Sequence, residues 1–254
     1  MRQFTYVMIA LLLAGCTKQE PRHFTHEVVN RMTPIKNQGE SETCWIYAML
    51  AAIETEHLAW GDSVNLSPYF IEKMLDKEPA CPKSKRGMGA TLLRLIQKYG
   101  IVGYSAMHST ATPPPRWVFL LGATYTVHEF ARSVCGPQEY LALTSNAHKP
   151  YYQTVDLDVA DNWLKNRFYN IPIDTLLAKT ERAVRRHHGV CWESKGHAMA
   201  IVGIARDDQG QPYFIMKNSW GTDHPYGGLD YLSFDDFREK TFAVEMTKKA
   251  YGEP

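Results

Sequence analysis

The sequence predicts an α+β protein with a helical N-terminal lobe, an antiparallel β C-terminal lobe and a cleft between them. Apolar residues recur at helical spacing up to residue 99, whereas short apolar runs separated by turn residues dominate from residue 197 onward. Helices followed by strands are typical of α+β proteins. The 254 residues, 44% of them hydrophobic and 22% charged, are enough to bury a substantial core.

The first expected helix begins at Cys44. Apolar residues recur every three or four positions from Cys44 to Trp60, and Gly61 follows as a stop signal. The segment is therefore predicted to be a buried helix that carries Cys44 in its first turn.

Two more helices are expected in the first half. Ser67 and Pro68 read as an N-cap followed by proline at the first helical position. Residues 88–99 carry an apolar face, and Gly100 ends that helix.

The second lobe is expected to begin after residues 112–115 (TPPP), a stiff tract that would mark the boundary between lobes. This assigns the domain to residues 33–254, with the helical lobe at 33–112 and the β lobe at 113–254. Residues 116–170 show no clear pattern, and a further helix follows Pro172. Strands are expected at residues 197–205, 213–217, 229–233 and 241–246.

The first fifteen residues read as a targeting segment. Arg2 precedes a largely apolar stretch that is too short to span a bilayer as a helix. The segment closes with residues 13–16 (LAGC), which resemble the lipobox of bacterial lipoprotein signals. We therefore expect a signal peptide at 1–15, a lipidated Cys16 with a tether at 16–32, and a lipid anchor in the bacterial cell envelope, at the outer membrane. An ordinary secretory signal is the alternative.

Charge and cysteine content exclude some classes of function. Lys and Arg number 28 against 27 Asp and Glu, so the net charge of +1 supplies no broad basic field for nucleic acid. Cys81, Cys135 and Cys191 contain no Cys-x-x-Cys pair, so neither a disulfide framework nor a zinc knuckle is predicted. One disulfide among these three remains open.

Three sequence segments contain residues that could support catalysis by Cys44. Cysteine catalysis requires a thiolate, which a helix N-terminus beside an imidazolium stabilises. Residues 34–39 (PIKNQG) precede Cys44, residues 196–203 (GHAMAIVG) carry a histidine, and residues 217–221 (KNSWG) carry an asparagine. Taken alone, Cys44 would read as a buried structural thiol. The three segments in this order resemble the active-site segments of papain-like cysteine peptidases.

The resemblance implies a role for each residue. Cys44 would attack the scissile carbonyl, and His197 would protonate the leaving amine and later activate water. Asn218 would orient the imidazole, and Trp220 would shield that hydrogen bond from water. Gln38 and the backbone N–H of Cys44 would form the oxyanion hole. No cofactor and no metal are implied.

Besides Trp220, three further residues are candidate substrate contacts. Gly87 and Gly89 precede the third helix, where the family holds substrate along glycine-rich backbone, although a plain turn fits equally. Glu42 stands where papain-like peptidases have glycine on the wall of the primary pocket. A preference for basic substrate side chains at that pocket is the resulting hypothesis.

The motifs resemble the bleomycin hydrolase and aminopeptidase C branch more than papain itself. Members of that branch are nearly twice as long and form hexamers, and a C-terminal arm restricts them to aminopeptidase action. This shorter chain is therefore expected to be a monomer with an open cleft that acts as an endopeptidase on peptides or proteins. The segments that carry the resemblance are residues 196–199 (GHAM), 223–224 (DH), 98–102 (KYGIV) and 169–173 (YNIPI).

Two alternative functions remain open. The chain could be a catalytically silent peptide-binding lipoprotein that lost turnover through the altered loop at residues 42–43. It could also be a thiol-dependent acyl transferase or amidase, because an amine can resolve an acyl-enzyme in place of water.

Overall fold

The computed structural model describes residues 22–252, so the expected lipobox with Cys16 and the start of the tether lie outside the described residues. The helices are α1 (Cys44–Ala59), α2 (Pro68–Leu75), α3 (Gly89–Tyr99), α4 (Val127–Val134), α5 (Ile173–Arg185), α6 (Phe234–Lys240) and α7 (Lys248–Tyr251). The strands are β1 (Phe24–Val29), β2 (Trp117–Leu120), β3 (Ala123–Thr126), β4 (Tyr140–Thr144), β5 (Gln153–Asp156), β6 (Arg167–Asn170), β7 (Val190–Glu193), β8 (Ala198–Asp207), β9 (Pro212–Lys217), β10 (Leu229–Ser233) and β11 (Ala243–Thr247).

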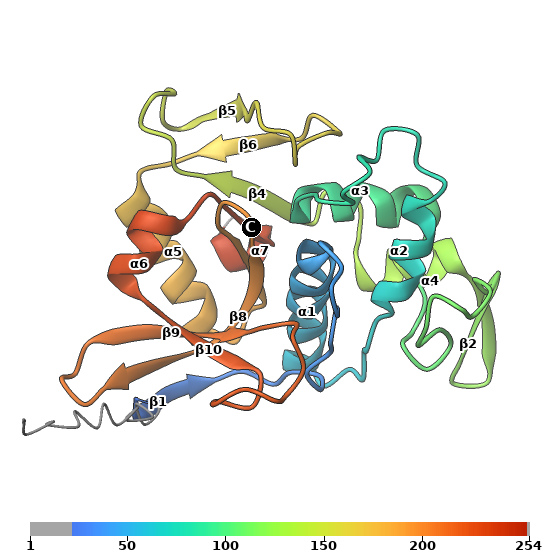
Figure 1. Cartoon of the computed structure of the whole chain (residues 1–254), viewed down its shortest axis with the longest axis horizontal. Helices are drawn as coiled ribbons and strands as arrows, with labels where there is room; N and C mark the ends of the chain where they lie inside the picture. Colours follow the sequence, from blue (N-terminus) through green and yellow to red (C-terminus); the bar gives the residue numbers. More distant parts are fainter. Residues whose placement is uncertain (1–21, 253–254) are drawn as a thin grey trace, which may run out of the picture.

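A nine-stranded sheet forms the β lobe, in the order β10-β9-β8-β7-β11-β4-β6-β5, with β1 paired to β8. Neighbouring strands run antiparallel except for the parallel pair of β4 and β6. The expected antiparallel sheet and the α+β class are therefore confirmed (Figure 1).

Helix α1 stands between the sheet and the helices α2, α3 and α4 (Figure 1). Every residue from 45 to 56 is buried, because β7 and β8 pack on one side of α1 and α3 on the other. This position explains the apolar helix expected after Cys44. Trp60 lies just beyond the helix and is 63% exposed, contrary to the expected pattern, with the ammonium of Lys249 3.5 Å from its ring centroid.

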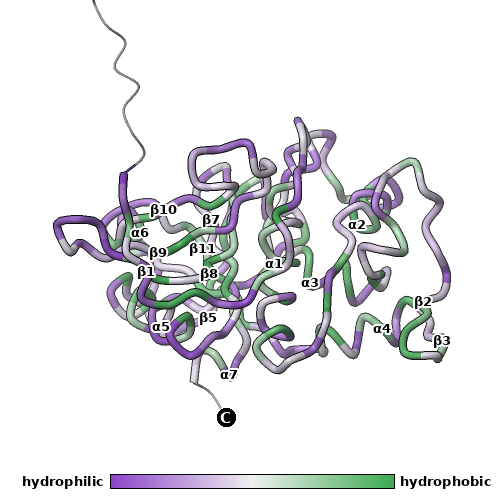
Figure 2. The backbone as a smooth tube through the Cα atoms, turned by 90° about the horizontal axis from the view of Figure 1, so that it is seen from below, coloured by the Kyte–Doolittle hydropathy of each residue, from purple (hydrophilic) through white to green (hydrophobic). Residues whose placement is uncertain are grey.

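Both faces of the sheet are covered, which sets the direction of each side chain. Val190 and Trp192 of β7 join the core that the sheet forms with α5, α6 and α7. Cys191 points to the opposite face, into the core around α1. Strand side chains alternate between faces, so Glu193 also points toward α1 and the cleft. In Figure 2, where the backbone is coloured by residue hydropathy, hydrophobic residues are concentrated in the interior around α1 and the central strands, and many of the outer loops are hydrophilic.

The lobe boundary expected at residue 113 is wrong. Val118, Phe130 and Val134 pack into the same core as α1, α2 and α3, so β2, β3 and α4 belong to the helical lobe. The chain enters the sheet at β4, from Tyr140 onward. The proline tract therefore lies inside the helical lobe, because the apolar residues after it are needed to cover α1 and α3.

The tether expected at residues 16–32 is also partly wrong. Phe24–Val29 form β1. This strand pairs with the second half of β8, along the same edge whose first half pairs with β7. Residues 24–29 are exposed or half-buried, and their apolar and polar residues do not alternate, so the sequence gave no clear strand signal.

Several local signals are confirmed. The hydroxyl of Ser67 accepts a hydrogen bond from the Phe70 N–H at the start of α2. Gly100 ends α3 with φ of +83°, a conformation that favours glycine. Cys81, Cys135 and Cys191 are free thiols, so the open disulfide is not formed among them.

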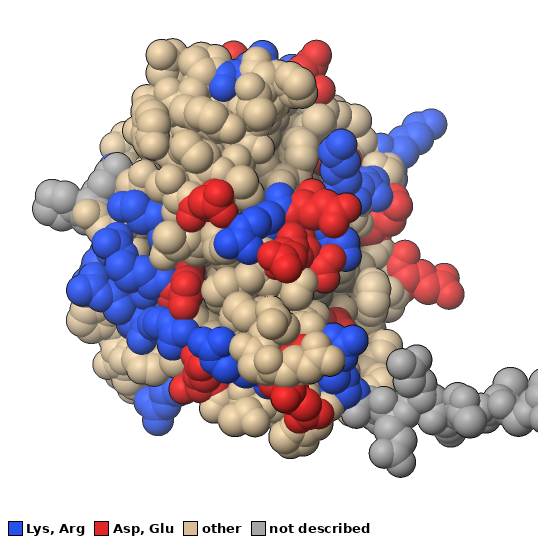
Figure 3. Space-filling model, turned by 90° about the vertical axis from the view of Figure 1, so that its left-hand side faces the viewer, with Lys and Arg blue, Asp and Glu red and all other residues tan. Residues whose placement is uncertain are grey.

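Surface features of the described part are unremarkable for a small domain. Within residues 22–252, no helix has both the length and the apolar character needed to cross a bilayer. On the face shown in Figure 3, Lys and Arg side chains lie beside Asp and Glu side chains.

Candidate active site

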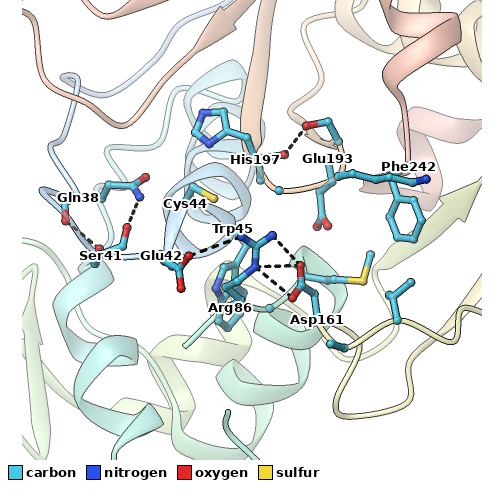
Figure 4. A pocket seen from close by; sticks show the side chains of 18 of the residues that line it. Gln38, Ser41, Glu42, Cys44, Trp45, Arg86, Asp161, Glu193, His197 and Phe242 are labelled. Atoms are coloured by element: carbon cyan, nitrogen blue, oxygen red, sulfur yellow. Dashed lines mark hydrogen bonds and ion pairs between the residues drawn. The ribbon is translucent and has the colours of Figure 1, made fainter. Parts of the chain in front are cut away.

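A cleft of about 620 Å³ lies where the two lobes meet, and it contains the residues that the motifs predict. Gln38, Cys44 and Trp45 line it from the helical lobe, and His197 and Trp220 line it from the β lobe. Cys44 and His197, which are more than 150 positions apart in the chain, thus line the same cleft (Figure 4).

Cys44 is the first residue of α1, as expected for a nucleophile at a helix N-terminus. Burial raises the pKa of its thiol, and the charge of Glu193 adds to the rise. Hydrogen bonds from the backbone N–H groups of Ala198 and Trp45 oppose that shift. Burial therefore opposes formation of the Cys44 thiolate, and a neighbouring base that takes the proton would offset this effect.

His197 is held in the orientation that a base requires. Its Nε2 lies 3.0 Å from Oδ1 of Asn218, whose Nδ2 donates to the Asp230 carboxylate at 2.6 Å. Because the amide nitrogen faces Asp230, the amide oxygen must accept from His197, so Nε2 carries the proton. The other ring nitrogen, Nδ1, is left to accept the proton of Cys44.

Trp220 covers this hydrogen bond. Its indole stacks on the imidazole of His197, with ring centroids 4.7 Å apart and an interplanar angle of 24°. Burial lowers the pKa of His197, while the bonds to Asn218 and the charge of Asp230 raise it. Burial thus favours the neutral thiol and neutral imidazole, and proton transfer creates two opposite charges that stabilise each other.

Gln38 is positioned by Ser219, which follows Asn218 beyond the end of β9. Its backbone N–H donates to the carbonyl of Ser219 at 2.8 Å, and its side-chain oxygen accepts from the Ser219 hydroxyl at 2.6 Å. The amide nitrogen donates one N–H to the carbonyl of Ser41. The second N–H of that amide remains for an oxyanion, as expected from the motif.

Residues 21–248 match the family model described as papain family cysteine protease. The chain belongs to the papain family. Papain from Carica papaya is 25% identical over 75% of this chain and 48% of its own length. Ananain from Ananas comosus is 24% identical over 80% of this chain and 53% of its own length. The chain thus spans about half the length of the curated relatives it matches.

Solved structures show the same fold. The crystal structure of pepw from Lactobacillus rhamnosis superposes with a TM-score of 0.69 at 16% identity, covering 89% of this chain and 82% of that chain. Bromelain from Ananas comosus, solved in complex with the E64 inhibitor, gives 0.52 at 16% identity over 85% of this chain and 94% of its own. At such identities the likeness shows the papain-like fold alone.

The candidate substrate contacts divide into two groups. Gly87 lines the cleft, and a Cβ there would lie 2.8 Å from the ring of Trp45, so only glycine fits. Gly89 does not line it: as the first residue of α3, it packs against the carboxylates of Glu193 and Glu245. A glycine is required at this position by that packing.

Glu42 lies on the cleft wall as expected, but it is not an isolated charge. One oxygen of Glu42 lies 3.6 Å from the Arg86 guanidinium, which also binds Asp161 at 3.1 Å (Figure 4). Arg86 comes from the helical lobe and Asp161 from the loop between β5 and β6, so this cluster bridges the cleft. The attraction of Glu42 for a basic substrate side chain is therefore reduced.

Sequence reasoning missed Arg86, Asp161 and the buried acid Glu193. Glu193 carried the clearest signal, because a carboxylate at the end of a short apolar segment (VCWE) is unusual in a buried strand. Cys191, Glu193 and Glu245 offer ligand atoms within 4.8 Å of one another, all buried. The backbone N–H of Gly89 at the start of α3 donates to Glu193, so the positive end of a helix already faces the position where a cation would lie.

Proposed function

We propose that this chain is a cysteine peptidase in which Cys44 forms a thioester with the acyl part of a peptide substrate. The observation that carries the proposal is the His197–Asn218–Asp230 chain of hydrogen bonds, which leaves Nδ1 of His197 as a base beside the nucleophile. Proton transfer from the Cys44 thiol accompanies attack on the carbonyl. The imidazolium then gives this proton to the leaving amine, and water releases the acid.

Gln38 and the N-terminus of α1 supply the donors for the oxyanion in this scheme. Removing one such donor in other enzymes lowers turnover by about a hundred- to a thousandfold. Ser219 forms hydrogen bonds with the backbone N–H and with the side-chain oxygen of Gln38. The amide N–H of Gln38 is therefore held in place before substrate binds.

We expect endopeptidase action. Among the described residues, none beyond Phe242 lines the cleft, and the α7 segment packs instead against α5 and β11. A blocked peptide without a free N-terminus should therefore be cleaved internally. Removal of single N-terminal residues only, from a peptide ladder followed by mass spectrometry, would contradict this expectation.

The same experiment separates hydrolysis from acyl transfer. Cleavage in heavy-oxygen water with an added amine should place one heavy oxygen in the new carboxylate, with the Cys44→Ala variant as the blank. An amide product that incorporates the amine would instead favour the transferase. Peptide binding by wild-type protein without any product would favour the silent binding lipoprotein.

The envelope location is a separate part of the proposal. It rests on the LAGC segment at residues 13–16 and its resemblance to a lipobox. Cys16→Ala should move the protein from the membrane fraction to the soluble fraction of the producing bacterium, whereas Cys81→Ala should not. Unchanged fractionation of Cys16→Ala would remove the lipid anchor from the proposal.

Membership of the bleomycin hydrolase and aminopeptidase C branch is proposed on the GHAM and YNIPI segments. A monomer is proposed with it, in contrast to the hexamers of that branch. Sedimentation of the purified protein should give the mass of one chain, and a larger assembly would contradict the monomer.

A further inference from the structure

Four carboxylates line the cleft, those of Glu40, Glu42, Asp161 and Glu193, and among them only Glu193 is buried. Glu42 and Asp161 both pair with Arg86. Glu193 has no Lys, Arg or His nitrogen within 4.0 Å among residues 22–252, although it lines the same cleft. Its side chain projects between Cys44 and Phe242 in Figure 4.

The surroundings of Glu193 are apolar on the cleft side. Met88, Val159 and Phe242 line the cleft around it, and Glu193 itself is only 4% exposed. One oxygen of its carboxylate accepts from the Gly89 N–H. A buried carboxylate in such a setting is stabilised by a partner that supplies a positive head and an apolar stem.

Glu193 and Glu245 form a buried pair of carboxyl groups that together carry one negative charge. Glu245 lies on the adjacent strand and is fully buried, with a carboxylate oxygen within 4.8 Å of one on Glu193. Two buried carboxylates at this distance do not both ionise. Burial raises the pKa of both groups, well above the ordinary value for Glu245 and to about 7 for Glu193. The deeper Glu245 therefore keeps its proton, and the charge resides on the carboxylate at the cleft.

We propose that Glu193 determines specificity by binding the ammonium or guanidinium of a lysine or arginine side chain of the substrate. This inference rests on the proposed peptidase function. The aliphatic stem of the substrate side chain packs on Met88, Val159 and Phe242, and its head reaches the carboxylate. Cation recognition is thereby assigned to Glu193 rather than to Glu42, whose charge is shared with Arg86.

Binding at Glu193 also affects the nucleophile. The negative charge of Glu193 opposes ionisation of Cys44, as its contribution to the raised pKa of that thiol shows. A substrate cation at Glu193 offsets this charge. A cationic substrate is therefore expected to gain in turnover as well as in binding.

The test compares arginine with citrulline, its neutral isostere, at each of the three residues before the scissile bond. At one position, wild-type kcat/KM should favour arginine by about 10- to 100-fold, the range of a charge-assisted hydrogen bond. Glu193→Gln should abolish this preference while cleavage of the citrulline peptide continues. Glu42→Gln and Glu245→Gln are matched controls and should retain it.

A binding measurement keeps the test independent of turnover. Cys44→Ala should bind the arginine peptide more tightly than the citrulline peptide, and Cys44→Ala with Glu193→Gln should bind both equally. Equal affinities in Cys44→Ala, or a preference that disappears in Glu42→Gln instead, would overturn the proposal. Stoichiometric zinc binding to Cys44→Ala that is lost in Cys191→Ser would assign the acidic cluster to a metal and would also overturn it.

The arginine-to-citrulline ratio should depend on pH in one direction. Burial raises the pKa of Glu193 to about 7, so its carboxylate becomes more ionised, and the ratio should rise, as the pH increases through that value. Titration of Cys44 and His197 affects both peptides and cancels in the ratio. The charged and titratable groups that interact with Glu193 are Glu245, Cys191, Cys44 and Asp161. The other such groups that line the cleft are Glu40, Glu42, Arg86, Lys195 and His197. A flat or falling ratio would contradict the assignment.

Discussion

Cys44→Ala is expected to lower peptide hydrolysis by at least about four orders of magnitude, because no other group in the cleft is placed to form the acyl-enzyme. His197→Ala should cost nearly as much. Removing the imidazole removes the acceptor for the Cys44 proton. Burial raises the pKa of this thiol, so it does not ionise readily without that acceptor.

Combining the two substitutions should lower the rate of peptide hydrolysis little further than Cys44→Ala alone. A nucleophile and its base act as a unit, so the double variant is expected to match Cys44→Ala within about threefold. Cys81→Ala, at a partly buried thiol that does not line the cleft, is the matched control and should keep activity within about twofold. Multiplicative losses in the double variant would mean that Cys44 and His197 act separately.

Gly189→Ala is expected to destabilise the fold by more than about 3 kcal/mol. Gly189 precedes β7, and a Cβ at this position would lie 1.9 Å from the carbonyl oxygen of Ala52 in α1. The obstacle is backbone in the central helix, so a side-chain rotation cannot relieve it. Separation of β7 from α1 would also move Glu193 away from the nucleophile.

Chemical denaturation followed by circular dichroism measures this effect. Gly103→Ala is the control, because the nearest atoms to its added Cβ lie 3.6 Å away or further and its φ is not positive. The control should change the unfolding free energy by no more than about 0.5–1 kcal/mol. A loss for Gly189→Ala as small as that of the control would show that β7 and α1 are not packed as described.

The positions of the candidate catalytic residues were predictable because each is fixed by its neighbours in the chain. Cys44 begins a helix, His197 precedes a run of apolar strand residues, and Asn218 directly follows a strand. Local sequence determines where each of these elements begins or ends. The cleft then follows from packing the sheet against α1, which has to be buried on all sides.

The errors came from regions where tertiary contacts override local pattern. β1 shows no regular alternation of apolar and polar residues, and its pairing with β8 makes it a strand. The proline tract suggested a boundary, but the apolar residues of α4 are needed to complete the helical core. Arg86 and Asp161 are 75 residues apart, and no local signal relates two such charges.

Labelling of the purified, reduced protein by an epoxysuccinyl peptide inhibitor, read by intact mass, tests the assignment of Cys44 most directly. The predicted result is one adduct per chain in the wild type, none in Cys44→Ala, and strongly slowed formation in His197→Ala. An adduct that persists in Cys44→Ala, or no adduct on folded wild-type protein, would contradict an activated nucleophile at Cys44.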